Sequence, residues 1–314
     1  MAIIGVQYRS KADDDGIGTS KISSFMSSAP DSVRPNFWEP AAVTDEIGAY
    51  NVAIIAYWPS EALYKEWREV SGFGVWWQGL DATSSAQGLF LEVFSPTADR
   101  WETVNSTADI VEGGSHMREG LSGAIREHGY WGSMRDRLPI SQTDGLDGEG
   151  KAENGFDKRT QDPLNSRIRV PGKKNLTVIR SGQDWSSTSP EERELYLETM
   201  RPVLIKGMNF LRDSGDEIGC YSCRFMDVVD FETGKADKER TFGLAYFDEL
   251  ASLEKWSKSH KTHLDIFGGF LKYAKQLGEA MTLKLHHEVL VLEPEQQFFE
   301  YVGCHGKTGM LGVV

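Results

Sequence analysis

The segments AYWPSEALYKEW (56–67) and AYFDELASLEKW (245–256) align without a gap, although they lie in opposite halves of the chain. Each combines the end of an apolar strand with an amphipathic helix. Two further pairs follow in the same order: GVQYRS (5–10) matches LTVIRS (176–181), and WETVN (101–105) resembles FEYVG (299–303). Three matches in one order predict that an αβ unit occurs twice. Recurrent αβ patterning without duplication is the alternative.

The second half has a regular pattern of elements. Ser189 and Glu192 have the spacing of a capping box, with Pro190 at the first helical position. Pro202 should kink or shorten the helix that follows. The predicted elements are strands over 175–182, 219–229, 240–247 and 282–292, a helix from Ser189, and a helical segment over 250–277 that is broken near Gly268 and Gly269. This βαββαβ order is the ferredoxin-like arrangement.

The first half shows the same kinds of element less clearly. The predicted elements are strands over 3–10, 51–58 and 88–95, helices over 21–28 and from Glu61, and an exposed loop over 145–155. We predict an α+β fold in which residues 1–108 and 171–314 form duplicated ferredoxin-like halves, joined by an irregular region over 109–170. The halves should pack face to face as an α+β barrel, as one compact structural unit.

Composition limits the classes of partner. The chain has 314 residues, of which 39% are hydrophobic and 26% charged, and its formal net charge is −13. This charge disfavours nucleic acid and anionic lipid as partners and favours a small-molecule substrate. No run approaches the roughly 18 apolar residues of a membrane span, and the first residues do not have the pattern of a signal peptide. We expect a cytoplasmic protein.

Three cysteines, Cys220, Cys223 and Cys304, are an odd number in a chain without a secretion signal, which favours reduced thiols. Cys220 and Cys223 form a CxxC, but no second CxxC is present to complete a zinc site. On a strand, positions three apart point to opposite faces. A zinc or redox role is therefore not expected, and covalent haem attachment is excluded because the motif is not CxxCH.

The strand TLKLHHEVLVL (282–292) contains two adjacent histidines that alternation separates. His287 shares a face with Leu283, Leu285, Val289 and Val291, whereas His286 lies on the other face. A histidine in an apolar row is either a hydrogen-bonded core residue or a metal ligand. The corresponding strand of the first half, LFLEVFS, has no histidine, which favours the ligand.

Arg180 is also in an apolar row, since it shares a strand face with Leu176 and Val178. A guanidinium is costly there unless an anion or a dipole pairs with it. It is either part of a structural ion pair or a functional residue.

Five strings resemble the haem-containing aldoxime dehydratases: EHGYWGSMRDRLPISQTD (127–144), NLTVIRSGQDW (175–185), GCYSCRF (219–225), HHEV (286–289) and FEYVGCHGKTGML (299–311). The resemblance extends from about residue 5 to residue 311. Two departures are present. A proline-rich segment of the family before its first strand is absent, and Cys223 stands where the family usually has Asn.

The resemblance implies a non-covalent haem b that is active in the ferrous form, and an aldoxime substrate R-CH=N-OH that is dehydrated to a nitrile. It implies His287 as the axial ligand of the haem iron, Ser222 and Arg180 as distal residues, and His305 as the catalytic acid. It also implies a homodimer. The remaining histidines, His116, His128, His260 and His263, are expected to be solvated or capping residues. A haem peroxidase or oxygen-activating enzyme and a haem carrier or sensor are the competing functions.

Overall fold

The computed structural model describes residues 1–84, 86–108, 111–150 and 162–313. In this part of the chain eleven strands form one curled antiparallel sheet, in the order β5-β10-β7-β9-β8-β2-β3-β1-β4-β11-β6. The strands are β1 (Ala2–Tyr8), β2 (Phe37–Thr44), β3 (Tyr50–Tyr57), β4 (Gly88–Phe94), β5 (Trp101–Asn105), β6 (Arg167–Val170), β7 (Leu176–Asp184), β8 (Cys220–Val228), β9 (Arg240–Phe247), β10 (Lys284–Leu292) and β11 (Gln297–Val302).

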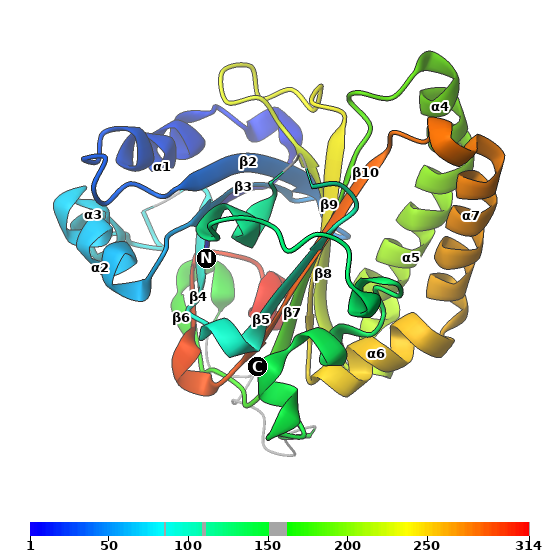
Figure 1. Ribbon diagram of the computed structural model, residues 1–314. Helices are drawn as coiled ribbons and strands as arrows, with labels where there is room; N and C mark the ends of the chain where they lie inside the picture. Colours follow the sequence, from blue (N-terminus) through cyan, green and yellow to red (C-terminus); the bar gives the residue numbers. More distant parts are fainter. Residues whose placement is uncertain (85, 109–110, 151–161, 314) are drawn as a thin grey trace.

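Helices cover the outer faces of the sheet in two groups (Figure 1). They are α1 (Ile17–Ser27), α2 (Glu61–Val70) and α3 (Phe73–Gln78) on one side, and α4 (Pro190–Leu195), α5 (Arg201–Ser214), α6 (Leu250–Ser259) and α7 (Lys261–Leu277) on the other. A π-helical turn, η8 (Tyr196–Met200), lies between α4 and α5. Among the described residues no helix is long and apolar enough to cross a membrane.

The core has separate parts on the two faces of the sheet. One apolar cluster lies under α1–α3 and another lies under α5 and α6. A third cluster fills the inside of the curled sheet, where residues from strands of both chain halves meet. Strands such as β3 and β9 are therefore buried on both faces, and this explains their nearly continuous apolar sequences.

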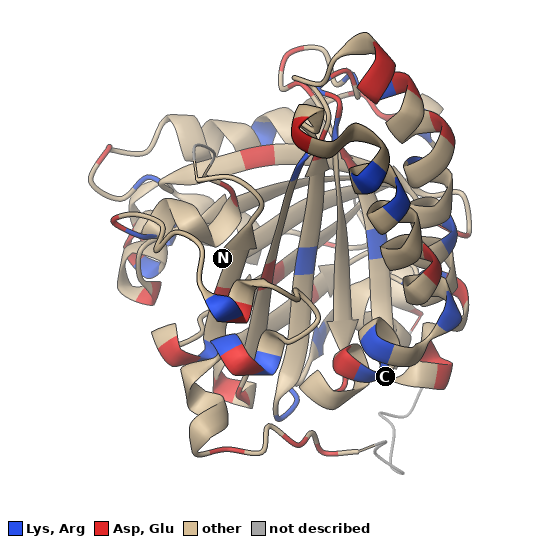
Figure 2. Ribbon diagram, turned by 45° about the vertical axis from the view of Figure 1, so that its right-hand side comes forward, with Lys and Arg blue, Asp and Glu red and all other residues tan. Residues whose placement is uncertain are grey.

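Charged side chains also occur inside the curled sheet. Figure 2 shows blue and red positions on the central strands as well as on the outer helices. The Arg224 guanidinium is paired with the Glu92 carboxylate, to which Tyr246 and Tyr301 also donate hydrogen bonds. Burial raises the pKa of Glu92, but Arg224 and the tyrosines outweigh this effect and hold it below its ordinary value.

Most of the expected elements are present with small changes in their ends, and three expectations are wrong. The break in the helical segment over 250–277 is at His260, between α6 and α7, and both Gly268 and Gly269 lie within α7. The loop over 145–150 is not fully exposed, because Leu146 is buried; residues 151–155 of that predicted loop lie outside the described residues. The expectation for Pro202, by contrast, agrees with the structure: the helix is interrupted there, since α5 starts at Arg201 directly after the π-helical turn.

The third correction concerns the CxxC. An irregularity in the pairing of β8 between Cys220 and Ser222 changes the alternation. Cys220 and Cys223 consequently both pack in the cluster under α5 and α6, not on opposite faces. Both thiols and Cys304 are free and buried. Burial raises the pKa of Cys223 to about 12, which makes it an inert structural thiol at neutral pH.

Candidate active site

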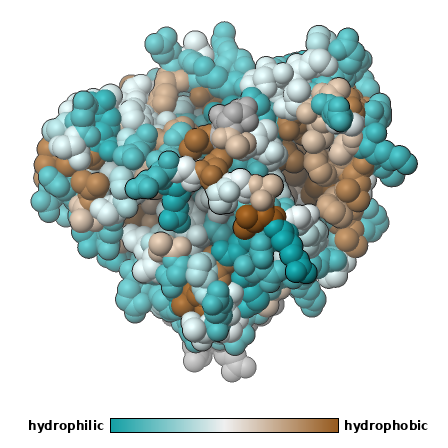
Figure 3. Space-filling model, in the orientation of Figure 1, coloured by the Kyte–Doolittle hydropathy of each residue, from teal (hydrophilic) through white to brown (hydrophobic). Residues whose placement is uncertain are grey.

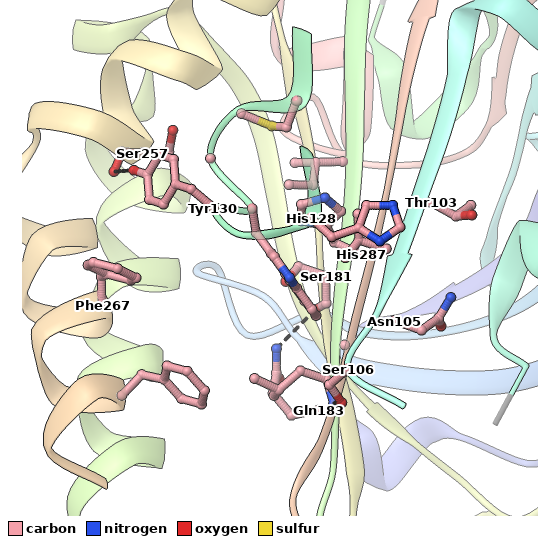
Figure 4. A pocket seen from close by; sticks show the side chains of 18 of the residues that line it. Thr103, Asn105, Ser106, His128, Tyr130, Ser181, Gln183, Ser257, Phe267 and His287 are labelled. Carbon is pink, nitrogen blue, oxygen red and sulfur yellow. Dashed lines mark hydrogen bonds between the residues drawn. The ribbon is translucent and has the colours of Figure 1, made fainter. Parts of the chain in front are cut away.

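A cavity of about 950 Å³ lies between the sheet and the second group of helices. Its floor is formed by β5, β10, β7 and β9, and its roof by α5, α6, α7 and the π-helical turn. Residues from the segment 118–132 close a third side. Figure 3 shows a hollow with brown, apolar lining on this face, and Figure 4 shows the side chains from close by.

Small side chains keep the floor of the cavity open beside His287. Ser181 on β7 is the direct cross-strand partner of His287, and Gly243 on β9 is the partner of Ser181. Side chains that face each other across antiparallel strands lie about 4.5–5.5 Å apart at Cβ, so Ser181 is next to the imidazole. All three residues line the cavity.

His287 is held on one side by a buried carboxylate. Its Nε2 lies 2.9 Å from Oε1 of Glu102 and 3.1 Å from Nη2 of Arg137. Nε2 donates to Glu102 when it carries a proton, and it can accept from Arg137 when it does not. Nδ1 has no hydrogen-bond partner in the part of the chain that the structure describes. This arrangement leaves one ring nitrogen to exchange a proton with a bound molecule.

Arg137 fixes the carboxylate and the wall of the cavity together. Its Nε and Nη2 donate to the two oxygens of Glu102 at 2.9 and 3.1 Å, and its other donor positions contact the carbonyl oxygens of Glu127, Tyr130 and Trp131. Burial raises the pKa of Glu102, but His287 and Arg137 outweigh burial and lower the pKa below its ordinary value. Glu102 is therefore a carboxylate beside His287.

His263 faces the same cavity from α7. It contacts the Trp256 ring, with the ring centroids 4.6 Å apart, and its Nδ1 is buried without a hydrogen-bond partner among the described residues. Burial is the main cause that lowers the pKa of His263 to about 4, although a backbone contact with Ser257 opposes it. The imidazole is therefore neutral at physiological pH, which is the form that ligates iron.

A bound haem fits these observations. His263 offers an unpaired ring nitrogen in apolar surroundings, and a buried polar atom without a partner is otherwise costly. The described residues contain no group of three or more histidine, cysteine, aspartate or glutamate side chains that could hold a metal ion by themselves. A metal held by a single protein ligand within a porphyrin needs no such group.

The structure does not bring the four residues expected from the sequence together, because only His287 lines the cavity. Arg180 points into the curled sheet, where it is completely buried and pairs with Glu39, Tyr57 and Glu288. These contacts form an ion pair of the kind that the sequence left as an alternative, and a functional role of Arg180 stays a prediction. Alternation along β7 is the reason, since Ser181 and not Arg180 faces the helices.

Ser222 and His305 also lie away from the cavity lining. Ser222 pairs with Tyr246, whose side chain is in the cluster inside the sheet. Nε2 of His305 lies 2.8 Å from Oδ2 of Asp45, and its backbone N–H donates to Gln7. His305 therefore fastens the C-terminal segment to the first half of the chain.

Four residues of the site were not selected from the sequence. Ser181 and Arg137 both occur in strings that carried the resemblance. Ser181 directly follows Arg180 in the string over 175–185, and Arg137 lies in the string over 127–144. Glu102 lies in WETVN, where alternation puts it on the face of Val104, beside His287. His263 was expected to be solvated or capping, whereas it is His260 that caps α7 by accepting from Thr262 N–H.

The comparisons with known proteins agree with a haem site. The family model described as haem-containing dehydratase matches residues 2–310. An aliphatic aldoxime dehydratase of Pseudomonas chlororaphis is 38% identical over 315 residues, with coverage of 99% of this chain and 86% of that protein. The phenylacetaldoxime dehydratase of Bacillus sp. (strain OxB-1) is 31% identical, with coverage of 84% and 74%.

Two solved structures that resemble this chain are also aldoxime dehydratases. The crystal structure of an aldoxime dehydratase in complex with butyraldoxime superposes with a TM-score of 0.88 at 35% identity, and the match covers 99% of this chain and 84% of that chain. A second aldoxime dehydratase structure has the same TM-score at 37% identity, with coverage of 99% and 86%. The protein belongs to the haem-containing dehydratase family.

Proposed function

We propose that this protein converts aldoximes to nitriles and water at a haem b bound in the cavity, with His263 as the ligand of the iron and His287 as the acid and base. The family match and the names of the relatives support the reaction. The observation that carries the assignment of roles is the contrast between the two imidazoles. His287 is paired with a carboxylate, whereas His263 is neutral and its Nδ1 has no hydrogen-bond partner among the described residues.

This assignment changes the roles expected from the sequence. His287 was expected to bind iron and His305 to supply the proton. His305 is bonded to Asp45 away from the cavity lining, so His287 takes the acid role and His263 takes the ligand role. His263 would hold the haem, and the ferrous haem would supply electron density at the oxime nitrogen.

His287 supplies the proton that the oxime oxygen needs as the N–O bond breaks. Hydroxide is a poor leaving group, so a proton must reach the oxime oxygen as the bond breaks. The imidazolium is stabilised through its Nε2–H by Glu102, and its Nδ1–H is left for the oxime oxygen. The same nitrogen then accepts the proton from the aldoxime carbon as the nitrile forms. His287 ends in the protonation state in which it began, and water leaves.

Ser181 and Arg137 position these groups. The Ser181 hydroxyl lies across the strand pair from His287 and can hold the oxime hydroxyl by a hydrogen bond. The Gln183 side chain donates to the Ser181 carbonyl oxygen at 3.2 Å, which supports the local conformation of β7 (Figure 4). Arg137 keeps Glu102 ionised and fixed beside the imidazole.

Anaerobic turnover tests the reaction. The purified haem protein is reduced, mixed with alkyl and aryl aldoximes, and assayed for nitrile by chromatography. Nitrile in the ferrous state only is the expected result. Absence of nitrile across the whole series contradicts the dehydratase and favours a carrier or sensor, whereas peroxide-dependent oxidation by the ferric form favours a peroxidase.

Two alanine variants test the roles. His263→Ala should lose the Soret band of bound haem, whereas His287→Ala should keep it and lose about 10²- to 10⁴-fold in kcat, the usual contribution of a general acid. His116→Ala is the control, because His116 does not line the cavity and the variant should keep both haem and turnover. Loss of haem in His287→Ala with retention in His263→Ala restores the roles read from the sequence.

We further infer that the fold is a duplicated ferredoxin-like unit, with copies over 1–108 and 171–314 and a connection over 109–170. The order β2-β3-β1-β4 in the first half is matched by β8-β9-β7-β10 in the second. The last strand of each half supports this inference because the two strands are exchanged: β5 pairs with β10, and β11 pairs with β4.

The oligomeric state and the cellular location of the protein are also proposals. A homodimer is proposed on the family resemblance alone, and light scattering coupled to gel filtration tests it. A cytoplasmic location is supported by the three free, buried cysteines, since secreted proteins usually oxidise such residues.

A further inference from the structure

We propose that Arg118 binds a haem propionate at the rim of the cavity, an inference that rests on the proposed haem site. Among the described residues that line the cavity, Arg118 is the one arginine, and no lysine, aspartate or glutamate accompanies it. The side chain is exposed, and no ion pair or side-chain hydrogen bond involves it in the described part of the chain. Its guanidinium is free to pair with a carboxylate of a bound molecule.

The cavity lining is divided by polarity. The side toward β9 and α5 is apolar, with Ala245, Leu204, Met208 and Leu211. The wall that follows β5 is more polar: its lining residues include Asn105, Ser106, Thr107, Ser122 and His128, with Ala108, Leu121 and Ala124 among them (Figure 4 labels Asn105, Ser106 and His128). Haem b carries both propionates on one edge. Burying an ionised carboxylate against apolar side chains is strongly unfavourable, so that edge belongs at the polar wall, where Arg118 lies.

The backbone that carries Arg118 is fixed although its side chain is exposed. The turn before it, η3 (Gly113–Met117), is held by a 2.8 Å hydrogen bond from Gly114 N–H to Glu288. Nδ2 of Asn105 donates to Oγ of Ser115, and the Arg118 N–H donates to the Ser115 carbonyl oxygen at 3.1 Å. The backbone of Arg118 therefore has a defined position, and little backbone entropy is lost when the guanidinium binds an anion.

The net charge of the protein makes this cation important. A chain with a formal net charge of −13 repels a dianionic cofactor at long range. A local positive charge at the rim offsets that repulsion where the propionates lie. Because the pair would be exposed to solvent, its contribution should decrease with salt.

Haem loss from the holoprotein tests the inference without a turnover assay. The ferric protein is mixed with excess apomyoglobin, and transfer is followed in the Soret region. Arg118→Ala should lose haem up to about fivefold faster than the wild type, the range of an exposed ion pair. Arg118→Glu should lose it about tenfold faster, because repulsion replaces attraction, and Arg118→Lys should resemble the wild type. The differences should shrink at about 1 M salt, where the Debye length is about 3 Å.

Two controls separate a propionate contact from other effects. Arg126→Glu makes the same change of charge at an exposed arginine of the same segment that does not line the cavity, and it should not change the rate. Haem dimethyl ester has no ionised propionates, and its rate of loss should be the same from the wild type and from Arg118→Glu.

Equal rates for Arg118→Glu and the wild type with natural haem would overturn the inference and leave the proposed function intact. The same is true of equal effects of Arg118→Glu and Arg126→Glu, which would indicate net charge alone. A wild-type protein that binds no haem would overturn the proposed function and this inference together.

Discussion

Arg137 joins the wall of the cavity to Glu102 and His287. Its side chain is 4% exposed, and it contacts both oxygens of Glu102, three backbone carbonyl oxygens and His287. Loss of one partner from such a buried pair typically costs about 3–5 kcal/mol, since the other charge stays buried without compensation. We therefore expect substitution of Arg137 to change both stability and turnover.

A comparison of two neighbouring arginines tests this reading. Arg137→Lys keeps the charge but cannot donate to both oxygens of Glu102, so kcat should fall at least about tenfold while the Soret band remains. Arg135→Lys is the control, because Arg135 pairs with Glu254 on α6. We expect its kcat to stay within about twofold, as for a partly exposed ion pair. Similar losses in both variants, measured as kcat and kcat/KM, contradict a specific role of Arg137.

At the residue scale, alternation predicted orientation better than it predicted role. It correctly put His287 on an apolar face and indicated that Arg180 needs an ionic partner. It could not identify His263, because the helix positions around it are amphipathic and its burial depends on Trp256 and the sheet below. Nor could it identify Glu102, which meets His287 only after two strands distant in the sequence pair.

The pairing of β7 with β10 is the element on which the geometry of the site depends. His287 lies opposite Ser181, and His286 on the other face lies opposite Gly182. A Cβ at Gly182 would meet Cε1 of His286 at 2.0 Å, so glycine is needed for this pair to form. The register that puts Ser181 beside His287 is thus linked to the absence of a side chain one residue later.

Two glycine variants test this dependence. Gly182→Ala should lower the free energy of unfolding by about 1–3 kcal/mol, the usual cost of overpacking, and should reduce kcat through a shift of β10. Gly268→Ala is the control, since a Cβ there meets nothing within 4 Å in the middle of α7. It should stabilise by up to about 1 kcal/mol through helix propensity. Urea unfolding gives both values, and an unchanged stability of Gly182→Ala contradicts the packing argument.

Long apolar strands were predictable, whereas short strands and a strand that contains proline were not. The bounds of β9 agree with the prediction, and α2 begins at Glu61 as expected, where Ser60 caps it. Strand β2 was missed because Pro40 interrupts a sequence of mixed polarity, although proline is tolerated where few ladder bonds are made. The strands β5 and β11 are short, and their matched sequences predicted a repeat but not their exchange between the halves.

Buried carboxylates determine how the whole molecule responds to acid. The pKa of Glu92 and that of Glu102 are below their ordinary value of 4.5, because nearby cations outweigh burial. Carboxylates with a lowered pKa contribute stability that is present above the unfolded value and is lost as the pH falls through the folded value. Burial raises the pKa of Glu112, so protonation of this residue at low pH favours the folded state and opposes the loss of stability.

The free energy of unfolding should therefore decrease below about pH 4.5, the region where unfolded glutamates take up protons. Glu92→Gln combined with Arg224→Met removes one pair without leaving an unpaired charge, and its stability should decrease less steeply between neutral pH and about pH 3. Glu66→Gln changes an exposed glutamate of α2 and should keep the wild-type slope. Urea titrations at several pH values give the slopes, and identical slopes for all three proteins exclude Glu92 as a source of acid sensitivity.

Inside the curled sheet, the two halves of the chain are linked by a reciprocal pair of hydrogen bonds. Tyr57 at the end of β3 donates to Glu288 on β10, and Tyr246 at the equivalent place on β9 donates to Glu92 on β4. Each tyrosine belongs to one aligned segment, and each carboxylate belongs to the opposite half. Both tyrosines are fully buried. Packing of one half alone would leave its carboxylate without this donor, so we expect the halves to unfold together.

Tyrosine-to-phenylalanine variants test the link. Tyr57→Phe and Tyr246→Phe should each lower the free energy of unfolding by about 1.5–3 kcal/mol, the usual contribution of a hydrogen bond to a charged group. The transition should remain single, because both halves lose the same stabilisation. Tyr64→Phe is the control, since its buried hydroxyl has no hydrogen-bond partner among the described residues and its removal should be neutral or stabilising. Two separate unfolding transitions in either linked variant, followed by tryptophan fluorescence and by the Soret band, would show that the halves are independent units.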